Sequence, residues 1–255
     1  MSNSDLPPQH SKELAAARTH TWSHEKDDRW TAVDQYAIKH LHPPGSANYA
    51  AINYAIQLAE EKQLPSIEVS LLQGKWLQTQ CQLIDARHVL EVGTLGGISS
   101  IWLGTSSSRV RVTTIEIAPE RKAVAEQAIA HAGLSERVEV MLGAGMDVLP
   151  KLRQEVARGE RSKFDLVFID ADKPNNLNYF NEAIQMVRSR GCIIVDNVVR
   201  RGRVADDELA KTDSQVEGAR RVIEGAGADE RVLGHTLLQT VGEKNYDGML
   251  ICVIK

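Results

Sequence analysis

The sequence predicts an α/β protein built on a mainly parallel β-sheet with helices on both faces. From residue 88 onward, short apolar runs alternate with stretches of helical periodicity, which is the pattern of repeated strand–helix units. The first apolar run opens through glycines into a helix, as ligand-binding α/β folds do. At the other end, HTLLQTVGEKNYDGMLICVI (235–254) predicts two strands joined by a short turn, with no helix between them.

Three helices are expected before the first strand. The spacing W-x-x-V-x-x-Y-x-I from Trp30 is helical until the sequence PPG at 43–45 stops it. A second helix fits 47–63, and a third fits roughly 66–82 with Pro65 at its start. These helices form an N-terminal extension to the sheet.

The segment 1–25 is polar and proline-containing, so we expect a loosely ordered tail there. The remaining residues, 26–255, are predicted to form a single domain, since α/β sheets of this length are commonly one domain. Within it, 26–85 hold the N-terminal helices and 86–255 hold the Rossmann-like core.

The strand–helix units follow in order along this core. The expected strands lie at 88–92, 109–116, 138–142, 164–170 and 192–197, with helices from about Ile98, at 119–133, near 146–157 and from Pro174 to about 188. Gly133 suits the end of the second of these helices, because glycine readily takes the left-handed conformation that ends helices.

Composition excludes several classes of function. Lys plus Arg number 30 against 34 for Asp plus Glu, a net charge of −4 that offers no basic excess for nucleic acid or an anionic membrane. No run of 18 apolar residues is present, so no membrane span is predicted. Cys81, Cys192 and Cys252 lack C-x-x-C spacing and are predicted to be reduced thiols in a cytoplasmic protein.

The glycine turn after the first strand indicates a nucleotide-like ligand. The dinucleotide fingerprint G-x-G-x-x-G fails, because Leu95 and Ile98 occupy its second and third glycine positions. The sequence instead fits the spacing Glu91-x-Gly93-x-x-x-Gly97, which suits a ligand that carries no pyrophosphate. The alternative is that this is simply the glycine-rich first turn common to α/β proteins.

Two acids refine the choice of ligand. Glu116 ends the second strand, where a carboxylate can accept hydrogen bonds from both hydroxyls of a ribose. Glu91, in the first strand, could pair with a ligand ammonium. A nucleoside with a cationic, amino-acid-like tail and no phosphate satisfies both, and S-adenosylmethionine matches that description.

Polar side chains also follow the fourth and fifth strands. Asp170 ends the fourth, while Asp196 and Asn197 end the fifth. If the strands are neighbours, these oxygens converge on one point and form a hard-oxygen set that favours Mg²⁺, allows Ca²⁺ or Mn²⁺, and disfavours Zn²⁺. The alternative is that each aspartate caps a turn.

Lys173 stands three residues after Asp170 in FIDADKPNN (168–176). Beside a dication its ammonium should lose a proton more easily, which suits a general base, although an exposed turn lysine is the alternative. Asp172 could cap the helix that begins at Pro174, and no chemical role is assigned to it.

With these residues in view, the chain resembles the cation-dependent class I O-methyltransferases of the catechol and caffeoyl-CoA type, and within them the small bacterial and fungal branch. The resemblance covers roughly residues 30–255. It is carried by RWTAVDQYAIKHLHPP, PSIEVSLLQGKWLQ, VLEVGTLGGISSIWL, RVEVMLGAGMDVLP, FDLVFIDADKPNN, IIVDNVVRRGRV and QTVGEKNYDGMLICVI. The pairing of FIDADK with VDN is the most specific of these features.

The resemblance implies a seven-stranded sheet whose last strand is antiparallel. It also implies roles for particular residues: Asp170, Asp196 and Asn197 as metal ligands, Lys173 and Asp170 as catalytic residues, and Val69, Glu91, Gly93, Ser99, Glu116, Ala144 and Asp170 as S-adenosylmethionine contacts. A homodimer, with the N-terminal segment contributing to the acceptor pocket, is implied too.

The function expected from these features is S-adenosylmethionine-dependent, divalent-cation-dependent O-methylation of a vicinal diphenol such as a catechol, caffeic acid or a catechol-type flavonoid. The expected partner is therefore a small phenolic substrate, with no nucleic acid and no membrane. Two alternatives remain open: a nucleotide-dependent oxidoreductase on a similar sheet, and a non-catalytic protein that binds S-adenosylmethionine.

Overall fold

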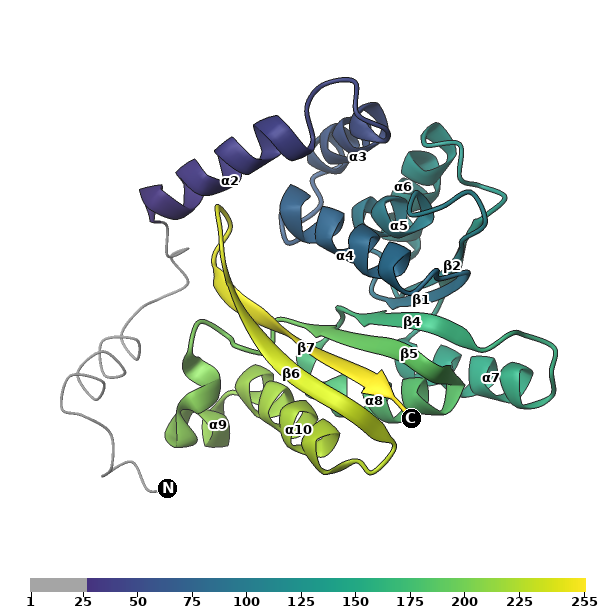
Figure 1. Ribbon diagram of the computed structural model, residues 1–255, viewed down its shortest axis with the longest axis vertical. Coiled ribbons are helices and arrows are strands. Elements are labelled where there is room, and N and C mark those ends of the chain that lie inside the picture. Colours follow the sequence, from purple (N-terminus) through teal and green to yellow (C-terminus); the bar gives the residue numbers. More distant parts are fainter. Residues whose placement is uncertain (1–26) are drawn as a thin grey trace.

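The computed structural model describes residues 27–255, and these form one seven-stranded sheet with helices on both faces (Figure 1). The strands are β1 (His88–Val92), β2 (Arg111–Glu116), β3 (Val138–Leu142), β4 (Phe164–Ile169), β5 (Val187–Asp196), β6 (Val232–Val241) and β7 (Tyr246–Ile254). Their order is β3-β2-β1-β4-β5-β7-β6. The first five pair in parallel, and β7 is antiparallel to both of its neighbours, which confirms the predicted fold class.

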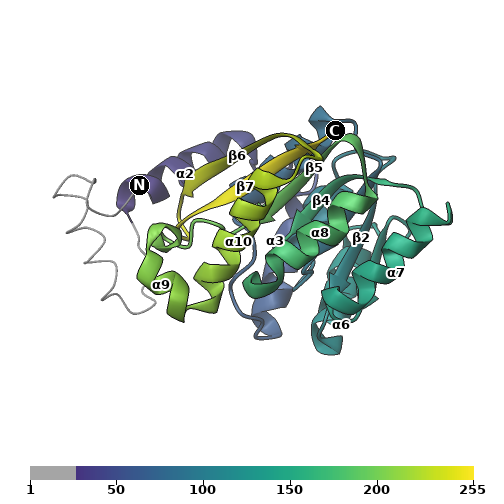
Figure 2. The ribbon, with the colours of Figure 1, turned by 90° about the horizontal axis from the view of Figure 1, so that it is seen from below.

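The helices form two layers, one on each side of the sheet. One layer holds α2 (Asp28–Leu41), α3 (Tyr49–Glu61), α4 (Leu71–Leu83), α5 (Ile98–Gly104) and α6 (Pro119–His131); the other holds α7 (Gly145–Ala157), α8 (Asn176–Met186), α9 (Asp207–Thr212) and α10 (Ser214–Ala228). Short 3₁₀ helices lie at η2 (Lys173–Asn175) and η3 (Arg203–Ala205). Figure 2, seen from below, shows α7, α8 and α10 side by side in front of the sheet.

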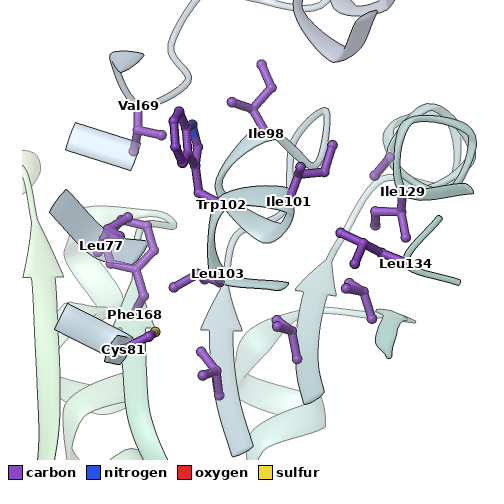
Figure 3. Close-up of a cluster of buried hydrophobic side chains, with 14 of the residues drawn as sticks. Val69, Leu77, Cys81, Ile98, Ile101, Trp102, Leu103, Ile129, Leu134 and Phe168 are labelled. Carbon is purple, nitrogen blue, oxygen red and sulfur yellow. The ribbon is translucent and has the colours of Figure 1, made fainter. Parts of the chain in front are cut away.

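Strand alternation divides the core between these layers, because successive side chains point to opposite faces. Phe168 belongs to the cluster on the α4 and α5 side, where Leu77 and Trp102 are also fully buried (Figure 3). Val167 belongs to the cluster on the α7 and α8 side with Phe180. Each face of the sheet therefore has its own core, as a doubly wound sheet requires.

The cysteines behave as predicted. Cys81, Cys192 and Cys252 are buried free thiols, and burial raises the pKa of each to about 12. They are therefore protonated and unreactive near neutral pH. Across residues 27–255, no helix is long and apolar enough to span a membrane.

The third N-terminal helix begins later than the sequence suggested. Its predicted start at about residue 66 is wrong, because α4 begins at Leu71. Ser70 and Gln73 form a capping box in which each side chain accepts a hydrogen bond from the other residue's backbone N–H. This box satisfies two of the free donors of the first turn, so the helix starts there and not at Pro65.

Two helices between β5 and β6 were not predicted. In α10, Val216, Ala219, Val222 and Ala226 are all fully buried and follow helical spacing, so a readable signal was present. Gly218 lets this helix approach the backbone closely: a Cβ there would lie 2.1 Å from the carbonyl oxygen of Lys173. Helix α10 therefore supports the backbone of a residue that belongs to the candidate site.

The predicted tail at 1–25 lies outside the described residues. Within the described part, the sheet runs without a break from β3 to β6, and the single domain at 26–255 stays a prediction.

Candidate functional site

The carboxyl ends of β1, β4 and β5 meet at the edge of the sheet where the sequence predicted a site. The backbone N–H of Asp170 donates to the carbonyl oxygen of Val92 at 2.8 Å, so the β4 end lies against the β1 end. Gly93 adopts a φ of +104°, and a Cβ there would lie 2.1 Å from the carbonyl oxygen of Asp170. Only glycine suits that position, for both its conformation and its space.

Glu91 is fully buried at this junction. One of its carboxylate oxygens accepts hydrogen bonds from Thr114 Oγ1, at 2.6 Å, and from Ser100 Oγ. The other, Oε1, has no hydrogen-bond partner in the described part of the chain. Burial raises the pKa of Glu91 to about 7, and the hydroxyl hydrogen bonds only partly oppose that shift. A buried acceptor without a donor is costly, and a ligand ammonium would supply the donor.

Glu116 lies at the end of β2, next to the glycine turn. Its two carboxylate oxygens accept the backbone N–H groups of Leu95, at 2.8 Å, and Ala118, at 3.0 Å. Leu95 has a φ of +50°, so the carboxylate holds a backbone turn that a non-glycine residue adopts reluctantly. Each carboxylate oxygen has a second lone pair, which leaves Glu116 able to accept hydroxyl groups as well.

The other predicted cofactor contacts surround this junction. Val69 lies just before α4 and packs near Trp102 (Figure 3), Ser99 is the second residue of α5, and Ala144 is the N-cap of α7. Val69 and Ser99 are buried, while Ala144 is half-buried. These residues come from three segments that reach the same edge of the sheet.

The predicted metal ligands are adjacent in the sheet. Ile169 pairs with Val195 in the parallel ladder between β4 and β5, so Asp170 and Asp196 occupy the next matching positions beyond it. Asp196 is almost fully buried, and the backbone N–H of Asn197 donates to its Oδ1 at 2.7 Å. Burial and the negative charge of Asp170 raise the pKa of Asp196 to about 8, although Lys173 partly opposes the shift.

This electrostatic arrangement fits a cation. Two neighbouring carboxylates at a strand end repel each other, and binding of a divalent ion would reduce the repulsion. Among residues 27–255, no cluster of three or more His, Cys, Asp or Glu side chains that could hold a metal is found. The candidate set consists of two carboxylates and the Asn197 amide, a composition that suits a hard ion such as Mg²⁺.

Lys173 is 6% exposed, so it is not the exposed turn lysine that was its alternative. Its Nζ donates to Asp170 Oδ1 at 2.7 Å. The ammonium thus lies at the same carboxylate that would bind a cation.

Asp172 has a structural partner that the sequence did not indicate. Its side chain makes no helix-capping hydrogen bond, and instead accepts hydrogen bonds from Tyr179 Oη and from Asn175 Nδ2 at 2.6 Å. The Tyr179 ring lies against Gly145, where a Cβ would come within 2.8 Å of it. Asp172 therefore ties the loop after β4 to α8 and, through Tyr179, to the start of α7.

A cavity of about 220 Å³ lies between α2, the start of α4 and the β6–β7 hairpin. Its apolar walls include Trp76, Leu238, Val241 and Met249. Met249 is the ladder partner of Asp196, so the cavity opens one strand away from the paired carboxylates. The sequence did not reveal this cavity, because its walls come from three segments far apart in the chain.

An open α/β sheet with acidic groups and glycine turns at its carboxyl edge is typical of proteins that bind nucleosides or nucleotides. A family model described as O-methyltransferase matches residues 47–253, and the chain belongs to that family. It is therefore an enzyme of the family predicted from the sequence, the S-adenosylmethionine-dependent O-methyltransferases, and methyl transfer is favoured over both alternatives.

Similar proteins agree with this assignment. An O-methyltransferase of Aspergillus flavus, imqG, is 42% identical over 91% of this chain and 94% of its own. A catechol O-methyltransferase of Niastella koreensis is 41% identical over 88% of this chain and 97% of its own. Among solved structures, the O-methyltransferase from Bacillus cereus in complex with SAH is 42% identical, covers 89% of this chain and 99% of its own, and gives a TM-score of 0.82.

Proposed function

We propose that this enzyme transfers a methyl group from S-adenosylmethionine to one hydroxyl of a vicinal diphenol, with the help of a divalent cation. The observation that carries the proposal is the arrangement at the sheet edge: Asp170 and Asp196 at adjacent strand ends, with buried Lys173 donating to Asp170. This combination supplies cation ligands and, once Lys173 has given up a proton, an amine that can accept one at the same point.

The cofactor end of the site is supported by Glu91 and Glu116. The unpartnered Glu91 Oε1 fits the ammonium of an amino-acid tail, and Glu116 retains lone pairs for ribose hydroxyls. The structure of the Bacillus cereus relative was solved in complex with SAH, the demethylated form of this cofactor. The chemistry that S-adenosylmethionine supplies when bound is a sulfonium methyl group open to attack by a nucleophile.

The cation end of the site is supported by Asp170, Asp196 and Asn197. When bound there, Mg²⁺ would supply Lewis-acid polarisation of the two diphenol oxygens, and Ca²⁺ or Mn²⁺ fits the same donors. Lys173 would accept the proton from the hydroxyl that attacks. A free phenol has a pKa of about 10, so deprotonation at the site is needed near neutral pH.

The cavity beside Met249 supports a diphenol that carries an apolar substituent. Its walls include Trp76, Leu238 and Val241, side chains that suit an aromatic or alkenyl group. Caffeic acid and catechol-type flavonoids have such groups, and simple catechols would leave the cavity unfilled. Relatives named catechol O-methyltransferase at 41% identity are consistent with this substrate class.

The test is methyl transfer from labelled S-adenosylmethionine to a panel of diphenols and matched monophenols. We expect transfer to the vicinal diphenols alone, loss of activity in EDTA, and recovery on addition of Mg²⁺. Methylation of a diphenol that persists in EDTA would contradict the cation requirement. Equal methylation of monophenols would contradict the choice of substrate class.

A homodimer and a cytoplasmic location, both implied at the level of the sequence, stay predictions. Light scattering of the purified chain measures the first, and fractionation of the producing cell measures the second.

A further inference from the structure

The loop that follows β5 has an unusual backbone. Asn197, Arg200 and Arg201 all have positive φ, at +56°, +54° and +59°, and Gly202 follows at +78°. Left-handed conformation costs a non-glycine residue roughly 1 kcal/mol or more, and it persists only where the surrounding structure enforces it. Some group must therefore hold this segment, which begins at a proposed cation ligand.

Asp247 on β7 provides that hold. Its Oδ1 accepts three backbone N–H groups: Val199 at 3.1 Å, Arg200 at 2.9 Å and Gly248 at 3.0 Å. Asp247 is 4% exposed, so these bonds are shielded from water. A carboxylate that accepts several N–H groups binds the backbone more strongly than a neutral acceptor would.

Gly248 completes the attachment. Its carbonyl oxygen accepts the N–H of Val198 at 3.1 Å, and a Cβ at this glycine would lie 2.5 Å from Val199 Cγ2. The pair Asp247-Gly248 thus extends the β5–β7 contact beyond its last ladder pair, Asp196 with Met249. Successive N–H groups of 198–200 are all bound to two residues of β7.

We propose that Asp247 is a positioning residue for the cation site, which holds residues 197–200 so that Asn197 keeps its left-handed conformation beside Asp196. The inference rests on the cation dependence proposed above. The role assigned to Asp247 is positioning, because its Oδ1 accepts three backbone donors from the loop and from β7. Its role resembles that of the outer groups that orient metal ligands in other proteins.

The first experiment measures Mn²⁺ binding to the cofactor-free protein by electron paramagnetic resonance. Asp247→Ala should weaken Mn²⁺ binding on the order of 10- to 100-fold, the range found when groups supporting metal ligands are removed. Asp247→Asn keeps an acceptor oxygen at the same position, and should retain most of the affinity.

A matched control is Asp165→Ala. Asp165 is also a buried carboxylate on a strand, and it accepts the backbone N–H groups of Arg87, at 2.7 Å, and His88, at 2.8 Å. It lies near the amino end of β4, away from the cation site. Its removal should lower stability while leaving Mn²⁺ affinity unchanged, which separates positioning from general destabilisation.

A second measurement needs no variant. In the wild-type protein without metal, the amide protons of Val199 and Arg200 should exchange slowly, because Asp247 binds both. Rapid exchange of these two amides would overturn the proposal, as would Asp247→Ala binding Mn²⁺ as tightly as wild type does. Wild-type protein that binds no Mn²⁺ would instead contradict the proposed cation dependence itself, so the two failures are distinguishable.

Discussion

Buried carboxylates at the two edges of the sheet have pKa values that are shifted in opposite directions. At the amino edge, Asp165 accepts two backbone N–H groups and pairs with Arg188. Burial alone would raise its pKa, but these partners outweigh burial and lower it. At the carboxyl edge, burial dominates, and the pKa values of Glu91 and Asp196 rise to about 7 and about 8.

The direction of the shift alone does not assign a role, since Asp247, at the carboxyl edge, also has a raised pKa although it holds backbone groups. The partners of each acid distinguish Asp165 from Glu91 and Asp196. Asp165 has partners for both of its oxygens within the chain. Glu91 has an oxygen without one, and Asp196 faces the like charge of Asp170. A buried carboxylate whose neighbours do not compensate its charge is costly to the apoprotein, so these two acids are candidates for ligand binding.

The largest expected effect is that of Asp196→Ala on activity. Loss of a cation ligand should reduce turnover on the order of 10³-fold, since Lewis-acid catalysis contributes several kcal/mol. The stability of the metal-free protein should fall little, because burial and the charge of Asp170 already disfavour the ionised form of Asp196 in the folded state. Turnover with labelled cofactor and urea unfolding in EDTA measure the two effects.

The unfolding measurement decides whether Asp196 is a structural acid. If Asp196→Ala lost about 3 kcal/mol of metal-free stability, the value expected when a compensated buried ion pair is broken, Asp196 would belong with Asp165 as a structural acid.

The next effect is that of Lys173→Ala. Turnover should fall on the order of 10²-fold or more, because general-base catalysis is lost while the cofactor site is unchanged. Calorimetric titration with S-adenosylmethionine should give an affinity close to that of wild type. Tyr179→Phe serves as a control in the same loop region: it removes the hydrogen bond to Asp172 but leaves the ammonium in place. Normal turnover in Lys173→Ala would mean that another group accepts the proton.

Much of this site was predictable because its residues follow directly from strand ends. The run LVFI before Asp170 and the run CIIV before Asp196 identify buried strands, and parallel strands present their carboxyl ends at one edge. Glu91 was likewise predictable, as an acid within an otherwise apolar strand.

Other parts were not predictable, because they depend on contacts between distant segments. Asp247 binds backbone groups of Val199 and Arg200, nearly fifty residues earlier, and its own sequence context shows only a polar residue in a hairpin. The cavity beside Met249 has the same origin. Helix α10 differs from both, since its apolar spacing was visible but lay within a strongly charged segment.

Asp165→Ala should lower stability and leave turnover unchanged, which is the reverse of the effects expected for Asp196→Ala. Removing the carboxylate leaves two backbone N–H donors and a partly exposed arginine without their partner, so the free energy of unfolding should fall by about 1–3 kcal/mol. Turnover of the folded protein should be unchanged. Urea unfolding and turnover at low temperature test both statements, and a large loss of turnover would remove the distinction between the two edges.

A further contrast between the two edges is the pH dependence of stability. Glu91 has a folded-state pKa of about 7, above the value of about 4.3 for an unfolded chain. A raised pKa favours the folded state when the group is protonated, so this stability is lost as pH rises from about 4 to about 7. Glu91→Gln cannot ionise, and the cofactor-free variant should therefore gain stability relative to wild type over that range.

For Asp165, the pH dependence of stability has the opposite sign. Its folded-state pKa is lowered, so its contribution is present above the unfolded value of about 3.9 and is lost as pH falls through the folded one. The difference in unfolding free energy between wild type and Asp165→Asn should therefore shrink toward acid pH. The corresponding difference between wild type and Glu91→Gln should change between pH 4 and 7. Urea unfolding of the three proteins across this range measures both curves. If the two differences in unfolding free energy changed with pH in the same way, the charge of Glu91 would be as fully balanced by its neighbours as that of Asp165. This result would remove the argument for a ligand ammonium beside Glu91.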